Sequence, residues 1–249
     1  MMRILINCDD LGASREINDA IFELMEQRRV TSATLMMNAP ETEDALQRMR
    51  LHPGCSFGIH LNSTEFTPLT SHPGLDPLLN EQGEFEKKLK HYPLTAVNRE
   101  AIYGEWCAQI DRAIAAGFAF SHIDSHEYIH TIPRLFGVLK RVQRKYRIRK
   151  IRITPNLFAP AEYKSLSLRA YKCAWNFALR HYVPTVTTDR FGAFYAFYQR
   201  VRQGLRLHGS VELMVHPGRK NFAEETDLLR EDWKDTLPKD ARLINYNEL

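Results

Sequence analysis

Near its start the chain reads Arg3-Ile4-Leu5-Ile6-Asn7-Cys8-Asp9-Asp10-Leu11-Gly12, a short apolar run that ends in two adjacent carboxylates. A run of this length and composition predicts a buried β-strand over residues 3–8. The turn after it lacks the glycine-rich loop that holds the phosphates of a dinucleotide, which argues against a doubly wound, nucleotide-binding sheet. A helix is expected from about Ser14, which can cap its first turn. The apolar stripe of that helix consists of Ile17, Ile21, Leu24 and Met25.

The alternation of strand and helix continues along the chain. Further strands are expected at residues 31–37, 55–61, 119–125, 150–154, 185–189, 210–215 and 241–244. Helices are expected at residues 41–49, 99–116, 133–146, 161–182, 194–205 and 224–235, and residues 62–95 form a long, proline-rich loop. Alternating elements of this kind predict an α/β fold with a parallel sheet and right-handed crossovers. About seven or eight such units favour a barrel over an open sheet.

Composition places the chain among ordinary globular proteins. Of its 249 residues, 44% are hydrophobic and 26% charged, which excludes disordered, collagen-like and disulfide-stapled classes. No repeat or linker-like shift in composition divides it, so residues 1–249 are expected to form one domain. The four cysteines form no CxxC pair, and the first apolar run is too short for a signal peptide or a membrane span. We therefore expect a cytoplasmic protein that does not enter a membrane.

The positive charge is concentrated in one stretch. Lysine and arginine number 34 against 30 acidic residues. Eight of the cations lie close together: Lys140, Arg141, Arg144, Lys145, Arg147, Arg149, Lys150 and Arg152. Such a stretch can bind nucleic acid, but it is more typical of a solvated helix face. We expect no nucleic-acid partner and keep nucleic-acid binding as the weaker alternative.

Ionisable side chains follow several of the predicted strands. Asp9 and Asp10 end the first strand, and as neighbours on a strand they are expected to point to opposite faces. His60 follows the third strand, and His216 ends a later one beside the rigid Pro217. Because the carboxyl ends of parallel strands meet at one rim, these groups are expected to share a site.

The fourth strand carries the most specific pattern, His122-Ile123-Asp124-Ser125-His126. Its period of two places His122, Asp124 and His126 on one face. Three polar groups on a buried face need mutual hydrogen bonds, water or a metal ion. An aspartate with two histidines suits a divalent cation such as Zn²⁺, a second carboxylate can take a proton from water, and a histidine can protonate a leaving group. The combination indicates metal-assisted hydrolysis.

Taken together, the motifs resemble those of the YdjC-like carbohydrate deacetylases, whose best-known members are chitooligosaccharide deacetylases. The matching segments are residues 7–12, 30–34, 58–62, 122–126 and 212–218, in the order of the family. The resemblance implies a distorted TIM-like (β/α) barrel that removes an N-acetyl group from an acetylated amino sugar. It also implies the site residues. Asp10, His60 and His126 would hold a divalent metal, Mg or Zn; Asp9 would be the general base, His216 the general acid, and Arg152 would orient the base.

One position departs from the family pattern. Many relatives have a histidine where this chain has Tyr128, two residues after His126. The three expected metal ligands are retained, so the change bears on the substrate pocket or the metal preference. The oligomeric state stays open, a homodimer included. The alternative enzyme class is a metal-dependent sugar isomerase or epimerase on the same barrel, which would use more carboxylate ligands than this chain offers.

Overall fold

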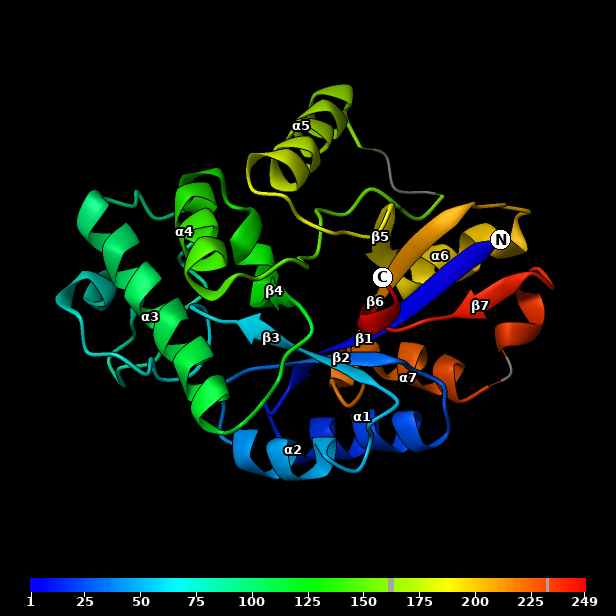
Figure 1. Cartoon of the computed structure of the whole chain (residues 1–249), viewed down its shortest axis with the longest axis horizontal. Coiled ribbons are helices and arrows are strands. Elements are labelled where there is room, and N and C mark those ends of the chain that lie inside the picture. The colour runs from blue at the N-terminus through cyan, green and yellow to red at the C-terminus, as the bar shows by residue number, and fades with distance from the viewer. Residues whose placement is uncertain (161–163, 232) are drawn as a thin grey trace.

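The strands form one parallel sheet that curls into a distorted barrel (Figure 1). The computed structural model describes residues 1–160, 164–231 and 233–249. Within them the strand order is β4-β3-β2-β1-β6-β5, and β7 pairs with the first residues of β1. The strands are β1 (Met2–Leu11), β2 (Ser32–Leu35), β3 (Ser56–Leu61), β4 (Ile123–Ser125), β5 (Arg190–Ala193), β6 (Gly209–Val215) and β7 (Ala241–Leu243). The expected α/β fold with parallel strands is confirmed.

Between β4 and β5 the wall of the barrel is formed by isolated bridges instead of regular strands. An isolated parallel bridge joins Ile123 to Ile151, and a second joins Lys150 to Val186, a few residues before β5. The strands expected at residues 150–154 and 185–189 are therefore reduced to single bridges. After Ile151 the backbone N–H of Thr154 donates to the side chain of Asn176 instead of to a neighbouring strand. Residues 186–189 change partners from the 149–150 segment to β6, so a regular ladder begins only at β5.

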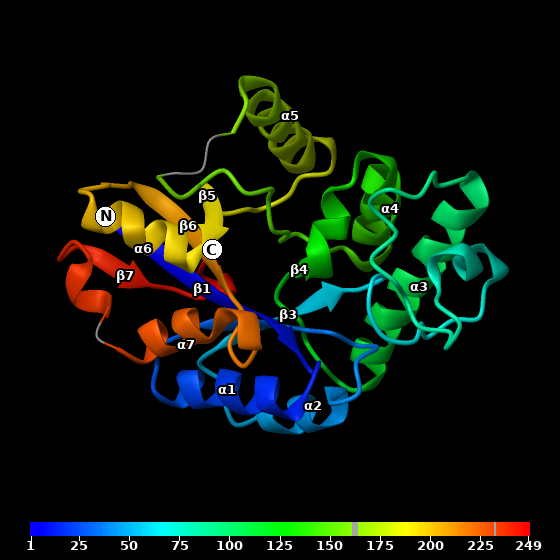
Figure 2. The same ribbon diagram turned by 180° about the vertical axis from the view of Figure 1, so that it is seen from behind.

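Helices surround the sheet (Figures 1 and 2). They are α1 (Arg15–Glu26), α2 (Thr42–Met49), α3 (Ala96–Ala115), α4 (Phe136–Tyr146), α5 (Leu166–Tyr182), α6 (Phe194–Arg202) and α7 (Ala223–Arg230). The expected cap of the first helix is present, since the side chain of Ser14 accepts from the third residue of α1. The structure also shows a capping box at the start of α3.

Two of the expected helices include residues outside the described part of the chain. The helix expected at residues 161–182 is observed from Leu166, after a Ser165 cap, and residues 161–163 lie outside the described part. The helix expected at residues 224–235 is observed as α7 followed by a 3₁₀ turn at Trp233–Thr236, with residue 232 outside the described part.

The expected loop at residues 62–95 is ordered and packed. It contains a 3₁₀ helix at Pro73–Leu78, and it inserts five apolar side chains into the main core. These are Leu75, Leu78, Phe85, Leu89 and Leu94. The loop is thus a structural part of one side of the barrel, close to the ends of β3 and β4.

The two faces of β1 differ in polarity. Ile4, Ile6 and Cys8 join the large apolar core beneath the helices, while the alternate residues face the barrel interior. Leu5 packs there in a small apolar cluster with Ile244 and Tyr246. Above this cluster the interior is polar. Its buried side chains include Asn7, Asp9, Thr34, His60, Asp124, Arg152 and Glu212.

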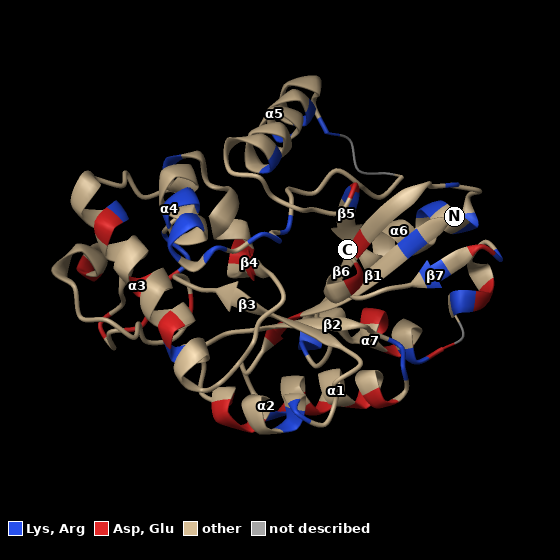
Figure 3. Cartoon of the chain, viewed as in Figure 1, with Lys and Arg blue, Asp and Glu red and all other residues tan. Residues whose placement is uncertain are grey.

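The basic stretch runs along α4 and the segment that follows it (Figure 3), and its members differ in burial and in partners. Lys140 and Arg152 are buried, and the ammonium of Lys140 donates to the carbonyl of Leu179. On the exposed side of α4, Arg141 pairs with Glu100, and Lys145 lies near Asp111 of α3. In the part of the chain that the structure describes, no helix has the length and apolarity needed to cross a membrane.

A glycine in β3 makes room for the inner histidine. A Cβ added at Gly58 would lie 2.5 to 2.8 Å from three ring atoms of His122, whose ring also stacks on Tyr246 at a centroid separation of 3.4 Å. We expect Gly58→Ala to lower the free energy of unfolding by about 1–3 kcal/mol through overpacking. Urea denaturation measures it. Gly137→Ala in α4 meets open space and is the control, with an expected gain of about 0.5 kcal/mol. Equal stability of the two variants would contradict the close fit.

Candidate metal centre and active site

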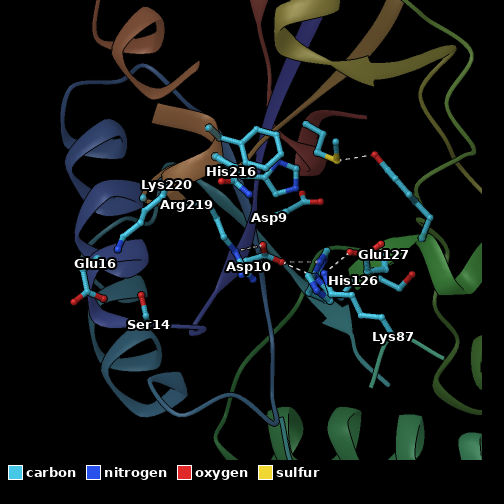
Figure 4. Close-up of a pocket in the computed structure, with 17 residues that line it drawn as sticks. Asp9, Asp10, Ser14, Glu16, Lys87, His126, Glu127, His216, Arg219 and Lys220 are labelled. Carbon is cyan, nitrogen blue, oxygen red and sulfur yellow. Dashed lines mark hydrogen bonds and ion pairs between the residues drawn. The ribbon is translucent and has the colours of Figure 1, made fainter. Parts of the chain in front are cut away.

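Three expected ligands converge at the rim of the barrel, where Figure 4 shows Asp10 and His126 facing each other. Asp10 lies at the end of β1, His60 in β3 and His126 directly after β4, and all three are buried. The Oδ1 atom of Asp10 lies 2.8 Å from Nδ1 of His126 and 3.3 Å from Nε2 of His60. One ligand atom from each residue lies within 4.8 Å of the others. The structure thus brings together residues that are 116 positions apart in sequence.

A bulge explains why both adjacent carboxylates reach the same pocket. The pairing of β1 with β2 shifts register between Cys8 and Leu11, and Asp10 adopts the left-handed φ of 66°. Asp9 keeps its place on the inner face, and Asp10 turns to line the same pocket. The expectation that the two side chains point to opposite faces is therefore wrong at this position.

The surroundings of His60 fit a metal ligand. Its Nδ1 lies 2.6 Å from Oδ1 of Asp124 and 3.2 Å from the hydroxyl of Thr34, which leaves Nε2 directed at Asp10. A carboxylate on the second ring nitrogen is the usual support of a metal-binding histidine. Burial alone would lower the pKa of His60, but Asp124 and Asp10 outweigh it and raise that pKa to about 10. The site therefore has a strong negative potential that a cation would satisfy.

A second group with suitable spacing consists of Asp9, His60 and Asp124. Both of its carboxylates are engaged by the fully buried Arg152, Asp9 through two contacts and Asp124 through one, whereas Asp10 has a single contact with the half-exposed Arg219. The donor set of Asp10, His60 and His126 therefore fits a divalent cation better, and two imidazoles with one carboxylate leave positions open for other ligands.

Arg152 holds Asp9 from the opposite side of the barrel. Its Nη1 and Nη2 atoms each lie 2.7 Å from a carboxylate oxygen of Asp9, and Nη1 also lies 2.6 Å from Asp124. Its Nε donates to Glu212 at 2.7 Å. Burial would lower the pKa of the guanidinium, but these three carboxylates raise it well above its ordinary value. The structure thus places Arg152 beside the carboxylate that the resemblance assigns as the base.

His216 lines the same pocket beside Asp9 (Figure 4). Its ring stacks on Phe222 at 4.4 Å, and its backbone N–H donates to Glu225. Burial lowers the pKa of His216, and Asp9 and Asp10 oppose that effect. Its Nδ1 is buried and makes no hydrogen bond to the described residues. An imidazole at the pocket wall can take up and pass on a proton.

His122 is not part of the pocket. It stacks on Tyr246 deeper in the barrel, and burial lowers its pKa to about 3. The period of two correctly groups His122 with Asp124 on the inner face, but the two residues lie in different layers of the interior, and only the upper layer reaches the rim.

Two residues that sequence reasoning missed close the site on its outer side. Arg219 donates from Nε to Oδ2 of Asp10 at 2.9 Å and from Nη2 to Glu65 at 3.2 Å. The same Glu65 oxygen lies 3.1 Å from Nε2 of His126. Arg219 follows the His216-Pro217-Gly218 turn, and Glu65 follows the Asn62-Ser63-Thr64 segment. Their closeness to the motifs was the available signal, but only the loop conformation brings them together.

The pocket has a volume of about 820 Å³ and a mixed lining. Acidic and basic groups face it from several elements, among them Glu16, Lys87, Glu127 and Lys220. Tyr128, at the position where the sequence departs from the family pattern, also lines it and donates to the sulfur of Met214. A polar pocket with aromatic walls suits a hydroxyl-rich ligand more than an apolar one.

The fold and the site define an α/β barrel with a candidate cation centre at the carboxyl ends of its strands. A family model described as YdjC-like protein matches residues 3–243, and the chain belongs to this family. The expected family membership is confirmed.

Individual relatives agree with this assignment. A carbohydrate deacetylase of Geobacillus stearothermophilus is 38% identical over 144 residues, which are 58% of this chain and 57% of that protein. The chain thus spans less than two thirds of this relative. A carbohydrate deacetylase of Brevibacillus brevis is 31% identical over 249 residues, covering 100% of this chain and 93% of that protein. A crystal structure from Enterococcus faecalis V583, whose description proposes cellobiose-phosphate cleavage, shares the fold with a TM-score of 0.77, at 23% identity and coverage of 99% and 98%.

Glu225, which anchors the backbone of His216, gives a pH-dependent contribution to stability. Burial raises the pKa of its carboxyl from 4.5 to about 7. The folded chain therefore holds a proton that the unfolded chain releases near 4.5, and stability falls as the pH rises from about 4.5 to about 7. We compare the unfolding free energy of Glu225→Gln with that of wild type at the same pH. This difference is expected to be roughly 2–4 kcal/mol more favourable to the variant at pH 8 than at pH 4.5. Urea titrations at both pH values measure it, with the exposed Glu224→Gln as control. A constant difference would contradict the buried, protonated carboxyl.

Proposed function

We propose that this protein is a metal-dependent hydrolase that removes the acetyl group from the nitrogen of an acetylated amino sugar. One observation carries the proposal. A cation-binding cluster, a carboxylate held by an arginine, and a histidine line one pocket at the rim of the barrel. The relatives described as carbohydrate deacetylases support the choice of an acetylated sugar as the substrate class.

Asp10, His60 and His126 would hold the metal, zinc or magnesium. A divalent cation bound there supplies Lewis acidity, which lowers the pKa of a water molecule and polarises the amide carbonyl. Asp9 accepts a proton from the attacking water, since its carboxylate lines the pocket and Arg152 keeps it oriented. His216 donates a proton to the amide nitrogen. The bond between the acetyl carbon and nitrogen then breaks, and acetate and a free amine result.

The cation dependence is tested by removing the metal. Treatment with a chelator is expected to abolish acetate release from N-acetylated amino sugars and short oligosaccharides, because the carbonyl is then not polarised. Zinc or magnesium added back singly, followed by metal analysis, identifies the ion that restores turnover. Full activity of metal-free protein would contradict the proposal. Formation of a ketose without acetate would favour the isomerase alternative.

Two histidine variants separate metal binding from proton transfer. His126→Ala is expected to lose both the metal and activity, because a ligand is removed. His216→Ala is expected to keep the metal and to lose turnover by about 10²–10⁴-fold, the range for a general acid. Isothermal titration with zinc and acetate-release kinetics measure the two effects. Loss of the metal from His216→Ala would show that the assignment of His216 as the acid is wrong.

A further inference from the structure

Tyr246 is the largest polar side chain in the inner cluster of the barrel, and it is held from several strands. Its ring stacks on His122 with an interplanar angle of 12°. Its backbone N–H donates to the hydroxyl of Ser56 at 2.9 Å, and its carbonyl accepts from the ammonium of Lys150. The residue is fully buried and does not line the pocket within the described residues. Its position is therefore fixed independently of any substrate.

The hydroxyl of Tyr246 is directed at the charged layer above it. It donates to Oε2 of Glu212 at 2.6 Å, and Oε1 of the same carboxylate accepts from Nε of Arg152 at 2.7 Å. Glu212 is fully buried. Both of its oxygens are thus engaged, one by the phenol and one by the guanidinium, and the phenol determines how the carboxylate is rotated.

The planarity of the guanidinium carries this constraint to Asp9. The Nε, Nη1 and Nη2 atoms of Arg152 lie in one plane, so a partner at Nε determines the direction of the other two nitrogens. Those nitrogens make the bidentate contact with Asp9, both at 2.7 Å. The contacts therefore run without interruption from Tyr246 through Glu212 and Arg152 to Asp9.

We propose that Tyr246 is a positioning residue of the hydrolytic site, which orients the carboxylate of Asp9 through Glu212 and Arg152. The inference rests on the proposed function, in which Asp9 accepts a proton from water. Within the described residues, the polar and ring contacts of Tyr246 are with Ser56, Glu212, Lys150 and His122, none of which is an expected metal ligand. Tyr246 is therefore expected to affect the proton transfer and not the binding of metal or substrate.

A purely space-filling role for Tyr246 makes a different prediction. Phenylalanine retains the ring, its stacking on His122 and the volume of the cluster, and it removes only the hydroxyl that reaches Glu212. If the residue only fills space, Tyr246→Phe will turn over substrate like wild type once the variant is folded and loaded with metal.

The test compares Tyr246→Phe with wild type and with a matched control. Tyr146→Phe is the control, because its hydroxyl is also hydrogen-bonded, to Asp111 at 2.7 Å, on the outside of the barrel between α4 and α3. We expect Tyr246→Phe to lower kcat by about 10-fold or more, as for other residues that orient a catalytic group through a hydrogen bond, while KM and the Kd for zinc change less than about twofold. Tyr146→Phe is expected to leave all three unchanged. Rates are normalised to metal content, so a loss of folded protein does not count as a loss of kcat.

A double variant keeps the proposal testable through a second residue. Glu212→Gln retains the shape of the side chain and weakens both contacts, so it is expected to lower kcat by a similar factor. Because both residues act through one series of contacts, Tyr246→Phe/Glu212→Gln is expected to be no slower than the slower single variant. Two results would overturn the positioning role while leaving the deacetylase proposal intact. One is a fold-loss of kcat in the double variant equal to the product of the two single losses, and the other is a wild-type kcat for Tyr246→Phe. A wild-type protein that releases no acetate would overturn both.

Discussion

The buried guanidinium of Arg152 is the interaction on which the site depends. Three buried carboxylates, from Asp9, Asp124 and Glu212, surround this one cation. Each carboxylate comes from a different strand, and burying any of them unpaired would be strongly unfavourable. The planar fork of arginine contacts all three at once, which a lysine cannot do with the same geometry. The position of Arg152 therefore determines where the three carboxylates lie.

The charges do not balance within this group, and the imbalance extends to the metal centre. One guanidinium neutralises one of three carboxylates, and Asp10 adds another negative charge nearby, which Arg219 offsets from the outer side. The pKa of His60 is raised because the ring lies in this negative region. Hydrogen bonds from His126 and His60 hold the pKa of Asp10 well below its ordinary value, although burial opposes them. A divalent cation and protons on the two histidines would thus compete for the same negative potential at the candidate cation site.

The order of strands and helices was predictable because the periodicity of apolar residues indicates which side chains are buried. The rim position of His60, His126 and His216 followed from their place at the ends of predicted strands. Features set by long-range contacts were not predictable. The bulge at Asp10 depends on the pairing of β1 with β2. The apolar pattern around Arg152 predicts an ordinary strand, but in the structure this segment forms only isolated bridges. Glu65 and Arg219 belong to loops, whose conformation no periodic pattern encodes.

Both strand ends and loops supply residues to the candidate site. Strand ends supply Asp9, Asp10 and His60, whose geometry is fixed by the barrel. Residues 62–95 are fastened to the same rim, since Lys87 and Lys90 both pair with Glu127, directly after His126. Glu65 ties the start of that loop to His126 and Arg219. These contacts join the loop to the segment that carries His126, so the loop and the candidate cation site are coupled. Strand ends thus carry the buried charged groups of the candidate site, and loops form much of the pocket wall, as is common in α/β barrels.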